Sequence, residues 1–171
     1  LGVVTNRGEI IWPDRQMMLY AIAVLSRNPG ALIIYDIKST AHLAKVIAEH
    51  KGQSLMWKTG HSIMKAKLEE TGALLAGEMS GHIFFKERWY GFDDALYTAA
   101  RLLEIVAKDT RDVSELFTAL PNSINTPELK LAIAEDKKFA FMQAFQAQVE
   151  FPGAKLSKID GVRAEFKDGW G

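Results

Sequence analysis

The sequence predicts an α/β fold: a mixed, mainly parallel sheet with helices on both faces, followed by an incomplete α+β domain. Three short apolar runs, at residues 31–37, 54–57 and 73–77, are interpreted as strands, and segments with helical periodicity lie between them. Strands that alternate with helices are typical of a parallel sheet, because each helix carries the chain back to the edge where the next strand begins. The residues after 121 lack this alternation, which indicates a second unit.

A hairpin and a helix are expected first. Residues 3–5 and 9–12 are strand-like and flank the turn-forming residues 6–8, so two paired strands are predicted. Pro13 stands where the next helix would begin, a position whose N–H has no partner within the helix. Apolar residues then recur at helical spacing, namely Met18, Ala21, Ile22 and Leu25. The Asn-Pro-Gly sequence at 28–30 ends this helix.

Two more helices separate the three strands. Ser39 or Thr40 can cap a helix that runs to about His50. A further helix is predicted near residues 62–70, and Gly72 can adopt the left-handed conformation that ends many helices.

The last helix of the α/β region is expected after Asp93 and Asp94, because acidic side chains in a first turn complement the helix dipole. The apolar stripe of this helix is interpreted as core packing and consists of Leu96, Ala99, Leu103 and Val106. In the tail, residues 126–134 are predicted to be a strand, and Asp136 to cap a helix. A hairpin with strands at 154–159 and 162–166 is expected to follow.

Three segments are expected along the chain. Residues 1–8 would be the end of a preceding domain or a linker strand, residues 9–121 the α/β domain, and residues 122–171 part of an α+β domain. The chain opens inside a strand-like stretch and stops without a closing element, which indicates a fragment of a longer protein.

The composition is that of an ordinary globular protein, with 48% hydrophobic and 25% charged residues. Lysine plus arginine number 21 and aspartate plus glutamate also number 21, so charge gives no argument for nucleic acid or an anionic membrane as partner. The absence of cysteine excludes disulfides and cysteine-ligated zinc sites. No apolar run approaches the roughly 20 residues of a membrane span, and no signal peptide opens the chain, so a cytoplasmic location is expected.

Polar side chains follow each of the three predicted strands. Lys38 follows the first and His61 lies just after the second, while Glu78, Ser80 and His82 follow the third. Because ligands of α/β sheets bind beyond the carboxyl ends of the strands, these loops form the candidate site. If the last loop is extended, alternation places its three polar side chains on one side.

The chemistry of this set of side chains suits a polyol. A carboxylate accepts hydrogen bonds from hydroxyls, a serine donates or accepts them, and lysine and histidine can meet a phosphate. No metal site is expected, since His61 and His82 have no evident third ligand. The competing interpretation is structural: Gly77 and Gly81 simply shape a turn.

Three sequence segments resemble a known family. They are KTGH at 58–61, GEMSGHIFFKERWYGFDD at 77–94 and AARLLEI at 99–105. They are similar to the third domain of the α-D-phosphohexomutases, and most of all to that of the bacterial phosphomannomutase/phosphoglucomutases. The final part of the chain resembles the start of the fourth domain.

The resemblance implies an isomerase reaction and a set of roles. Enzymes of this family interconvert hexose 1-phosphate and hexose 6-phosphate through a phosphoserine and a 1,6-bisphosphate intermediate, with Mg²⁺ as cofactor and glucose 1,6-bisphosphate as activator. By this resemblance Glu78 and Ser80 bind the sugar hydroxyls, Lys38 and His61 contact the sugar phosphate, and His82 binds substrate and assists proton transfer as the catalytic candidate.

Some family elements are not found in the sequence. The phosphoserine loop and the metal-binding loop have no counterpart in it, so its partner would be the rest of a mutase chain, and the 171 residues alone are expected to be inactive. Two alternatives stay open, a free-standing module that binds sugar phosphate without catalysis and part of a phosphoglucosamine mutase.

Overall fold

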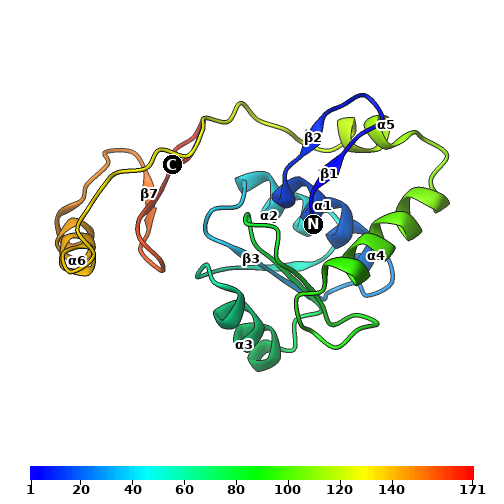
Figure 1. The fold of residues 1–171 in the computed structure, drawn as a ribbon, viewed down its shortest axis with the longest axis horizontal. Helices are drawn as coiled ribbons and strands as arrows, with labels where there is room; N and C mark the ends of the chain where they lie inside the picture. Colours follow the sequence, from blue (N-terminus) through cyan, green and yellow to red (C-terminus); the bar gives the residue numbers. More distant parts are fainter. The chain divides into compact units, whose positions relative to one another are not determined.

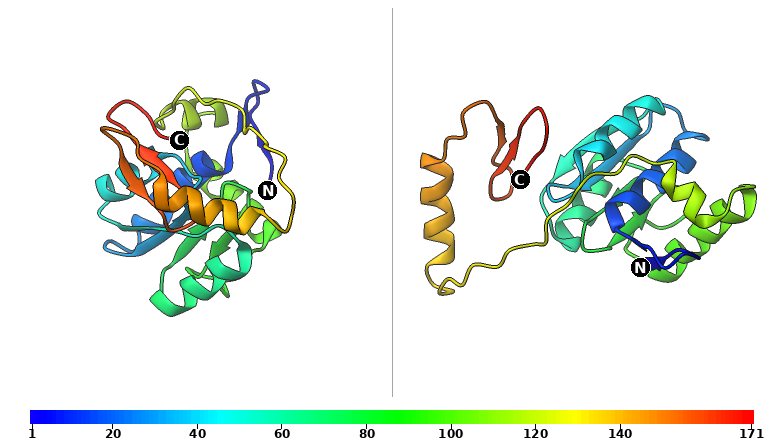
Figure 2. Two further views of the ribbon diagram at one scale, coloured as in Figure 1. Left: turned by 90° about the vertical axis from the view of Figure 1, so that its left-hand side faces the viewer. Right: turned by 90° about the horizontal axis from the view of Figure 1, so that it is seen from above.

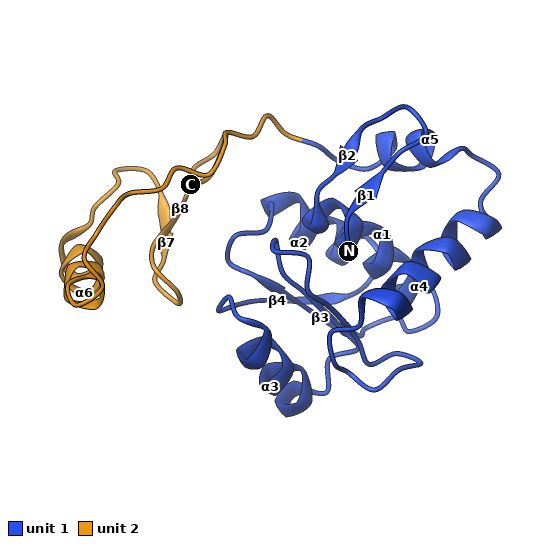
Figure 3. Ribbon diagram, in the orientation of Figure 1, with its two compact units in different colours: residues 1–122 blue, residues 123–171 orange.

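A four-stranded sheet organises the first part of the chain. Its order is β4-β3-β5-β6. The parallel strands are β3 (Leu32–Asp36), β4 (Gln53–Trp57) and β5 (Leu75–Gly77), and β6 (Ile83–Phe85) runs antiparallel to β5. The computed structural model describes residues 1–171, which form two compact units, 1–122 and 123–171 (Figures 1 and 3).

Helices cover both faces of this sheet, which confirms the predicted α/β class (Figure 2). The helices of the first unit are α1 (Pro13–Leu25), α2 (Ala41–Glu49), α3 (His61–Thr71), α4 (Ala95–Lys108) and α5 (Val113–Thr118). Ile33 and Tyr35 of β3 pack with residues of α1 and α2, whereas Ile34 packs with Met64 and Leu68 of α3. This division follows from the alternation of side chains along a strand.

Local signals in the sequence account for the helix boundaries. Pro13 is the first residue of α1, and the side chain of Thr40 accepts a hydrogen bond from the backbone N–H of His42 at 3.3 Å at the start of α2. Asp94 caps α4 by accepting from the N–H of Tyr97 at 3.0 Å. These caps confirm the predicted helix starts, because each satisfies a backbone donor that has no partner within the helix.

The amino-terminal hairpin packs on the same unit. Strand β1 (Val3–Val4) pairs antiparallel with β2 (Ile10–Ile11), as predicted. Their buried side chains lie in a cluster with α5 residues that includes Leu116 and Phe117. Helix α5 was not predicted; an aspartate and a glutamate at 112 and 115 form a capping box at its start.

The buried face of α4 differs from the prediction. Leu96 and Leu103 of the predicted stripe are 86% and 67% exposed, so the interpretation of that stripe as core is wrong for them. The helix instead buries Thr98 and Arg101, and Leu102 packs against the main core. Apolar residues occur on more than one side of this helix, so its periodicity alone did not determine which side faces the protein.

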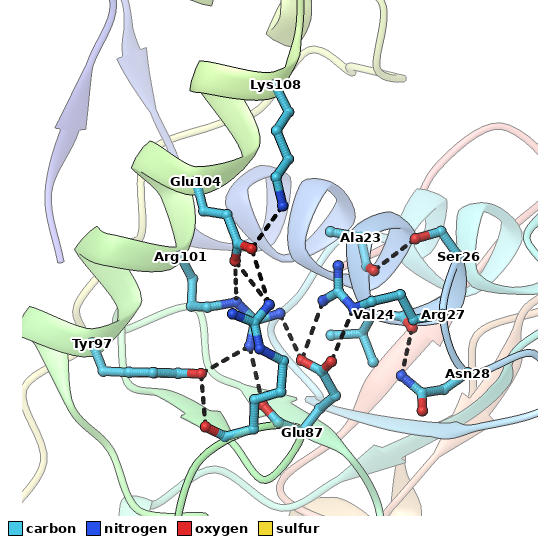
Figure 4. A network of polar contacts seen from close by, with 11 residues as sticks. Ala23, Val24, Ser26, Arg27, Asn28, Glu87, Tyr97, Arg101, Glu104 and Lys108 are labelled. Atoms are coloured by element: carbon cyan, nitrogen blue, oxygen red, sulfur yellow. Dashed lines mark hydrogen bonds and ion pairs between the residues drawn. The ribbon is translucent and has the colours of Figure 1, made fainter.

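An ion network joins α4 to the turn after α1 and to the loop after β6 (Figure 4). The carboxylate of Glu87 lies 2.7 Å from Arg101 Nη2 and 3.0 Å from Arg27 Nε. Arg101 is 3% exposed, donates to the Glu87 backbone oxygen and the Tyr97 hydroxyl, and lies 3.4 Å from Glu104. Burial raises the pKa of Glu87, but the hydrogen bond from Arg27 and the charge of Arg101 outweigh it, so that the pKa is lowered.

The second unit contains α6 (Lys138–Gln148) and a hairpin of β7 (Lys155–Ser157) and β8 (Arg163–Glu165), which confirms the predicted helix and hairpin. Two predictions fail. Residues 126–134 form no strand, since no neighbouring strand satisfies their backbone groups. Asp136 does not cap α6, whose first flanking residue is Lys137 with no side-chain cap. No helix of the chain is both long and apolar enough to cross a membrane.

The two units should differ in protection from hydrogen exchange. Ile33 and Ile34 of β3 are 0% exposed, whereas Phe141 and Phe145 of α6 are 54% and 39% exposed. Because well-buried segments open only with most of the unit, the amides of β3 and β5 should exchange more slowly than those of β7, β8 and α6. Mass spectrometry of exchange in the native chain measures this, and equal protection in the two units would contradict it.

Candidate functional site

The loops that follow β3, β4 and β5 lie at one edge of the sheet, because these strands are parallel neighbours. Lys38 is exposed in the turn after β3, and its charge acts on the carboxylate of Asp36. His61 begins α3 after β4, and Glu78 follows β5 directly. The structure therefore brings the predicted loops together at the carboxyl ends of the strands, where α/β proteins bind ligands.

Glu78 is the most unusual side chain at this edge. It is 2% exposed, and its Oε2 accepts a hydrogen bond of 2.7 Å from the backbone N–H of Gly60. Gly60 has a φ of 130°, a conformation that favours glycine. Glu78 Oε1 is buried and has no hydrogen-bond partner. A buried oxygen without a donor costs free energy, so this atom is set up to accept from a ligand.

The loop at 78–82 is a tight turn and not the extended segment that alternation suggested. The N–H of Gly81 donates to the Glu78 backbone oxygen at 2.9 Å, and the N–H of Glu78 donates to the His82 backbone oxygen at 2.9 Å. Gly81 has a φ of 95°, which a side chain would strain. Because the loop is not extended, the condition for placing the three side chains on one side is not met. Glu78 is buried while Ser80 and His82 are exposed.

His82 lies close to His61 and to Asp93. The centres of the His61 and His82 rings are 5.6 Å apart. His82 Nδ1 is 2.7 Å from Asp93 Oδ2. A carboxylate only accepts, so Nδ1 carries the proton of this contact and Nε2 is left for another partner. Sequence reasoning gave Asp93 only a helix-dipole role, since nothing in its spacing indicated His82.

Asp36 also lies at this edge, although the sequence did not indicate it as a site residue. This carboxylate, at the end of β3, is 0% exposed and accepts from Ser39 Oγ at 2.6 Å and from Thr59 Oγ1 at 3.4 Å. The backbone N–H of Met79, in the turn after β5, acts to lower the pKa of Asp36. Asp14 of α1, 7% exposed, accepts from the N–H of Thr40 at 3.0 Å. The signal in the sequence was an acid in an otherwise apolar strand, YDI at 35–37.

The electrostatics of this edge disfavour the charged forms of three carboxyls. Burial raises the pKa of Asp14, of Asp36 and of Glu78. For Glu78 the hydrogen bond from Gly60 and the charge of His82 act in the opposite direction without cancelling the effect of burial. The His, Asp and Glu side chains form no group of three or more that could hold a metal ion.

Replacing Glu78 by Gln should stabilise the first unit at neutral pH. An acid whose folded-state pKa is raised contributes stability that is fully present below its ordinary value, 4.5, and that is lost as pH rises through the folded-state pKa. The variant lacks this loss. The difference in free energy of unfolding between the variant and the wild type should therefore grow as pH rises above 4.5. Urea unfolding from about pH 4 to 8 measures the difference, and an advantage independent of pH would contradict the expectation.

The chain is similar to proteins of a known family. Residues 12–124 match the family described as phosphoglucomutase/phosphomannomutase, alpha/beta/alpha domain III. The chain is 55% identical over 171 residues to a phosphomannomutase/phosphoglucomutase of Pseudomonas putida and 56% identical over 173 residues to a phosphoglucomutase of Neisseria meningitidis. Each match covers 100% of this chain, which spans only 37% of the length of either relative.

Solved structures show the same relationship. A phosphoglucomutase/phosphomannomutase family protein of Burkholderia thailandensis superposes with a TM-score of 0.91 at 58% identity, over 99% of this chain and 36% of the other. A putative phosphomannomutase of Thermus thermophilus, at 17% identity and a TM-score of 0.70 over 99% of this chain and 36% of its own, shares the fold. The matched domain and the high identities show that this chain belongs to the phosphoglucomutase/phosphomannomutase family.

Proposed function

We propose that this chain supplies sugar recognition in a mutase that interconverts hexose 1-phosphate and hexose 6-phosphate, with glucose and mannose as the hexoses. The observation that carries the proposal is the carboxylate of Glu78. One of its oxygens is held by Gly60, and the other is buried without a donor at the edge of the sheet. A sugar hydroxyl can supply the missing hydrogen bond.

The other side chains of the site have roles that fit a sugar phosphate. Ser80 is exposed in the same turn and can donate to or accept from a second hydroxyl. Lys38 and His61 are exposed cationic or donor groups that can contact the phosphate. His82, with Nε2 left for another partner by Asp93, can move a proton to or from a hydroxyl as the catalytic residue.

The remaining parts of the reaction belong to the longer protein in this proposal. The names of the relatives support a phosphoryl-transferring isomerase, and the chain spans 37% of their length. We place the phosphoserine, the Mg²⁺ ligands and the rest of the substrate site in the other parts of the mutase, with glucose 1,6-bisphosphate as intermediate and activator. Residues 9–121 would then be its third domain, residues 122–171 part of its fourth, and residues 1–8 the linker strand before them.

A titration of the isotope-labelled chain with α-D-glucose 1-phosphate tests the proposal. We expect NMR signals of Lys38, His61 and residues 78–82 to shift together, with weaker effects from inorganic phosphate or from glucose alone, since each lacks half of the recognised groups. We also expect no turnover of glucose 1-phosphate by the 171 residues, even with Mg²⁺ and the bisphosphate, because no phosphoserine loop is found in them. Shifts confined to other surfaces, or measurable turnover, would overturn the proposal.

A further inference from the structure

Asp36 is a buried carboxylate to which the proposed mechanism gives no role. It is 0% exposed and lies at the end of β3, in a position where an apolar side chain would avoid the cost of burying a charge. Burial raises its pKa, although the hydrogen bond from Ser39 and the backbone N–H of Met79 act in the opposite direction. Its presence therefore needs a reason other than the stability of the sheet.

The hydrogen bonds of Asp36 join two loops of the candidate site, and the third loop acts on its carboxylate. Ser39 Oγ donates to Oδ1 at 2.6 Å from the turn after β3, next to Lys38. Thr59 Oγ1 lies 3.4 Å from Oδ2 and belongs to the loop after β4, two residues before His61. The backbone N–H of Met79, in the turn after β5 and directly after Glu78, acts to lower the pKa of Asp36. The carboxylate of Asp36 thus interacts with three segments of the chain.

We propose that Asp36 is a positioning residue, which holds the loops carrying Lys38, His61 and Glu78 at fixed distances from one another. The proposal deepens the function proposed above and rests on it for the identity of the ligand. Hydrogen bonds to a carboxylate are stronger than those between neutral groups, and here they are shielded from water. A site held in this way loses little entropy when it binds, because its groups are already in place.

Two neighbouring hydrogen bonds also hold these loops in place. The N–H of Gly60 donates to the carboxylate of Glu78 at 2.7 Å, which ties the loop after β4 to the turn after β5 a second time. The N–H of Thr40 donates to Asp14 at 3.0 Å, which ties the turn after β3 to α1. Asp36 joins the loops after β3 and β4, and the hydrogen bond between Gly60 and Glu78 extends this connection to the turn after β5.

Three variants of the full chain test this role. Asp36→Asn removes the charge with little change of shape, and Ser39→Ala removes one of the donors. Ser114→Ala is the matched control, because Ser114 is also 0% exposed and its Oγ donates to Asn6 at 2.9 Å, but it lies on α5 away from the site. Site-resolved hydrogen exchange, the amide shift of Met79 and titration with α-D-glucose 1-phosphate are measured for each.

We expect Asp36→Asn to move the Met79 amide signal and to speed exchange in all three loops while exchange in α4 and α5 is unchanged. Ser39→Ala should act in the same direction, and the dissociation constant for glucose 1-phosphate should rise about tenfold in both, because misplaced binding groups lose affinity. Ser114→Ala should alter neither the loops nor the affinity.

Several results would contradict the proposed positioning role of Asp36. Faster exchange in one loop only, or an equal increase throughout residues 1–122, would mean that Asp36 does not set the geometry of the site. A similar loss of affinity in Ser114→Ala would mean the same. If the wild-type chain does not bind glucose 1-phosphate, the proposed function fails, whereas the exchange pattern and the Met79 shift still decide whether Asp36 positions the loops.

Discussion

Replacing Glu87 by Met should lower the free energy of unfolding of residues 1–122 by about 3–5 kcal/mol. Glu87 is 8% exposed and neutralises Arg101, which is 3% exposed and therefore cannot turn to water. Removing the carboxylate leaves a guanidinium in the core next to Phe85 and Tyr97, with Glu104 at 3.4 Å as the closest remaining acid. Urea unfolding followed by circular dichroism measures the loss.

Two further variants show whether the cost comes from the buried charge. Glu69→Met removes an exposed carboxylate that pairs with Lys86 at 2.9 Å, so the same substitution there should cost no more than about 1 kcal/mol. The double variant Glu87→Met with Arg101→Met replaces both charges by apolar groups and should recover most of the loss. A double variant as unstable as Glu87→Met alone would mean that packing, and not the uncompensated charge, dominates.

Glu78→Gln should lower kcat/KM for hexose phosphate by about 10- to 100-fold in a mutase that contains this chain. The substitution removes the charge from a carboxylate whose Oε1 is buried without a partner and is proposed to accept from a sugar hydroxyl. A hydrogen bond to a charged group contributes about 1.5–3 kcal/mol, and about 1.4 kcal/mol corresponds to a factor of ten. Steady-state kinetics on glucose 1-phosphate and mannose 1-phosphate measure the loss.

The pattern of the loss identifies the role of Glu78. The decrease should be similar for the two sugars, which differ at the 2-hydroxyl, a group that is not assigned to this carboxylate. The dependence on Mg²⁺ should not change, because the metal ligands are placed outside this chain. Glu69→Gln, at an exposed ion pair, serves as the control and should keep full activity. Loss of activity on one sugar only, or a large increase in the Mg²⁺ requirement, would contradict the assignment.

The gain in stability and the loss of activity expected for Glu78→Gln have one origin. Burial of this carboxylate raises its pKa, which means that the fold bears a cost for the charged form. The same burial excludes water from Oε1, so that a hydroxyl that reaches it is not in competition with solvent. Functional sites commonly reduce stability for this reason.

The order of the elements could be predicted because its signals are local. The helix cap at Thr40, the proline at 13 and the turn residues at 6–8 act within a few positions of the chain, and each of these predictions is confirmed. Strand β6 and helix α5 were not predicted. The apolar run of β6 is only three residues long, and it becomes a strand because β5 offers its edge for pairing.

The sequence by itself determined the α/β class and the loops in which the polar side chains of the site lie, because strand ends follow from hydrophobic patterning and parallel strands align their ends. Only the tertiary structure decided that Glu78 is buried, that Asp93 contacts His82, that Asp36 joins the loops after β3 and β4, and that α4 buries Arg101. These outcomes depend on contacts between residues far apart in the chain. The free energy of burying a charge depends on the partners that folding brings to it, which no local pattern records.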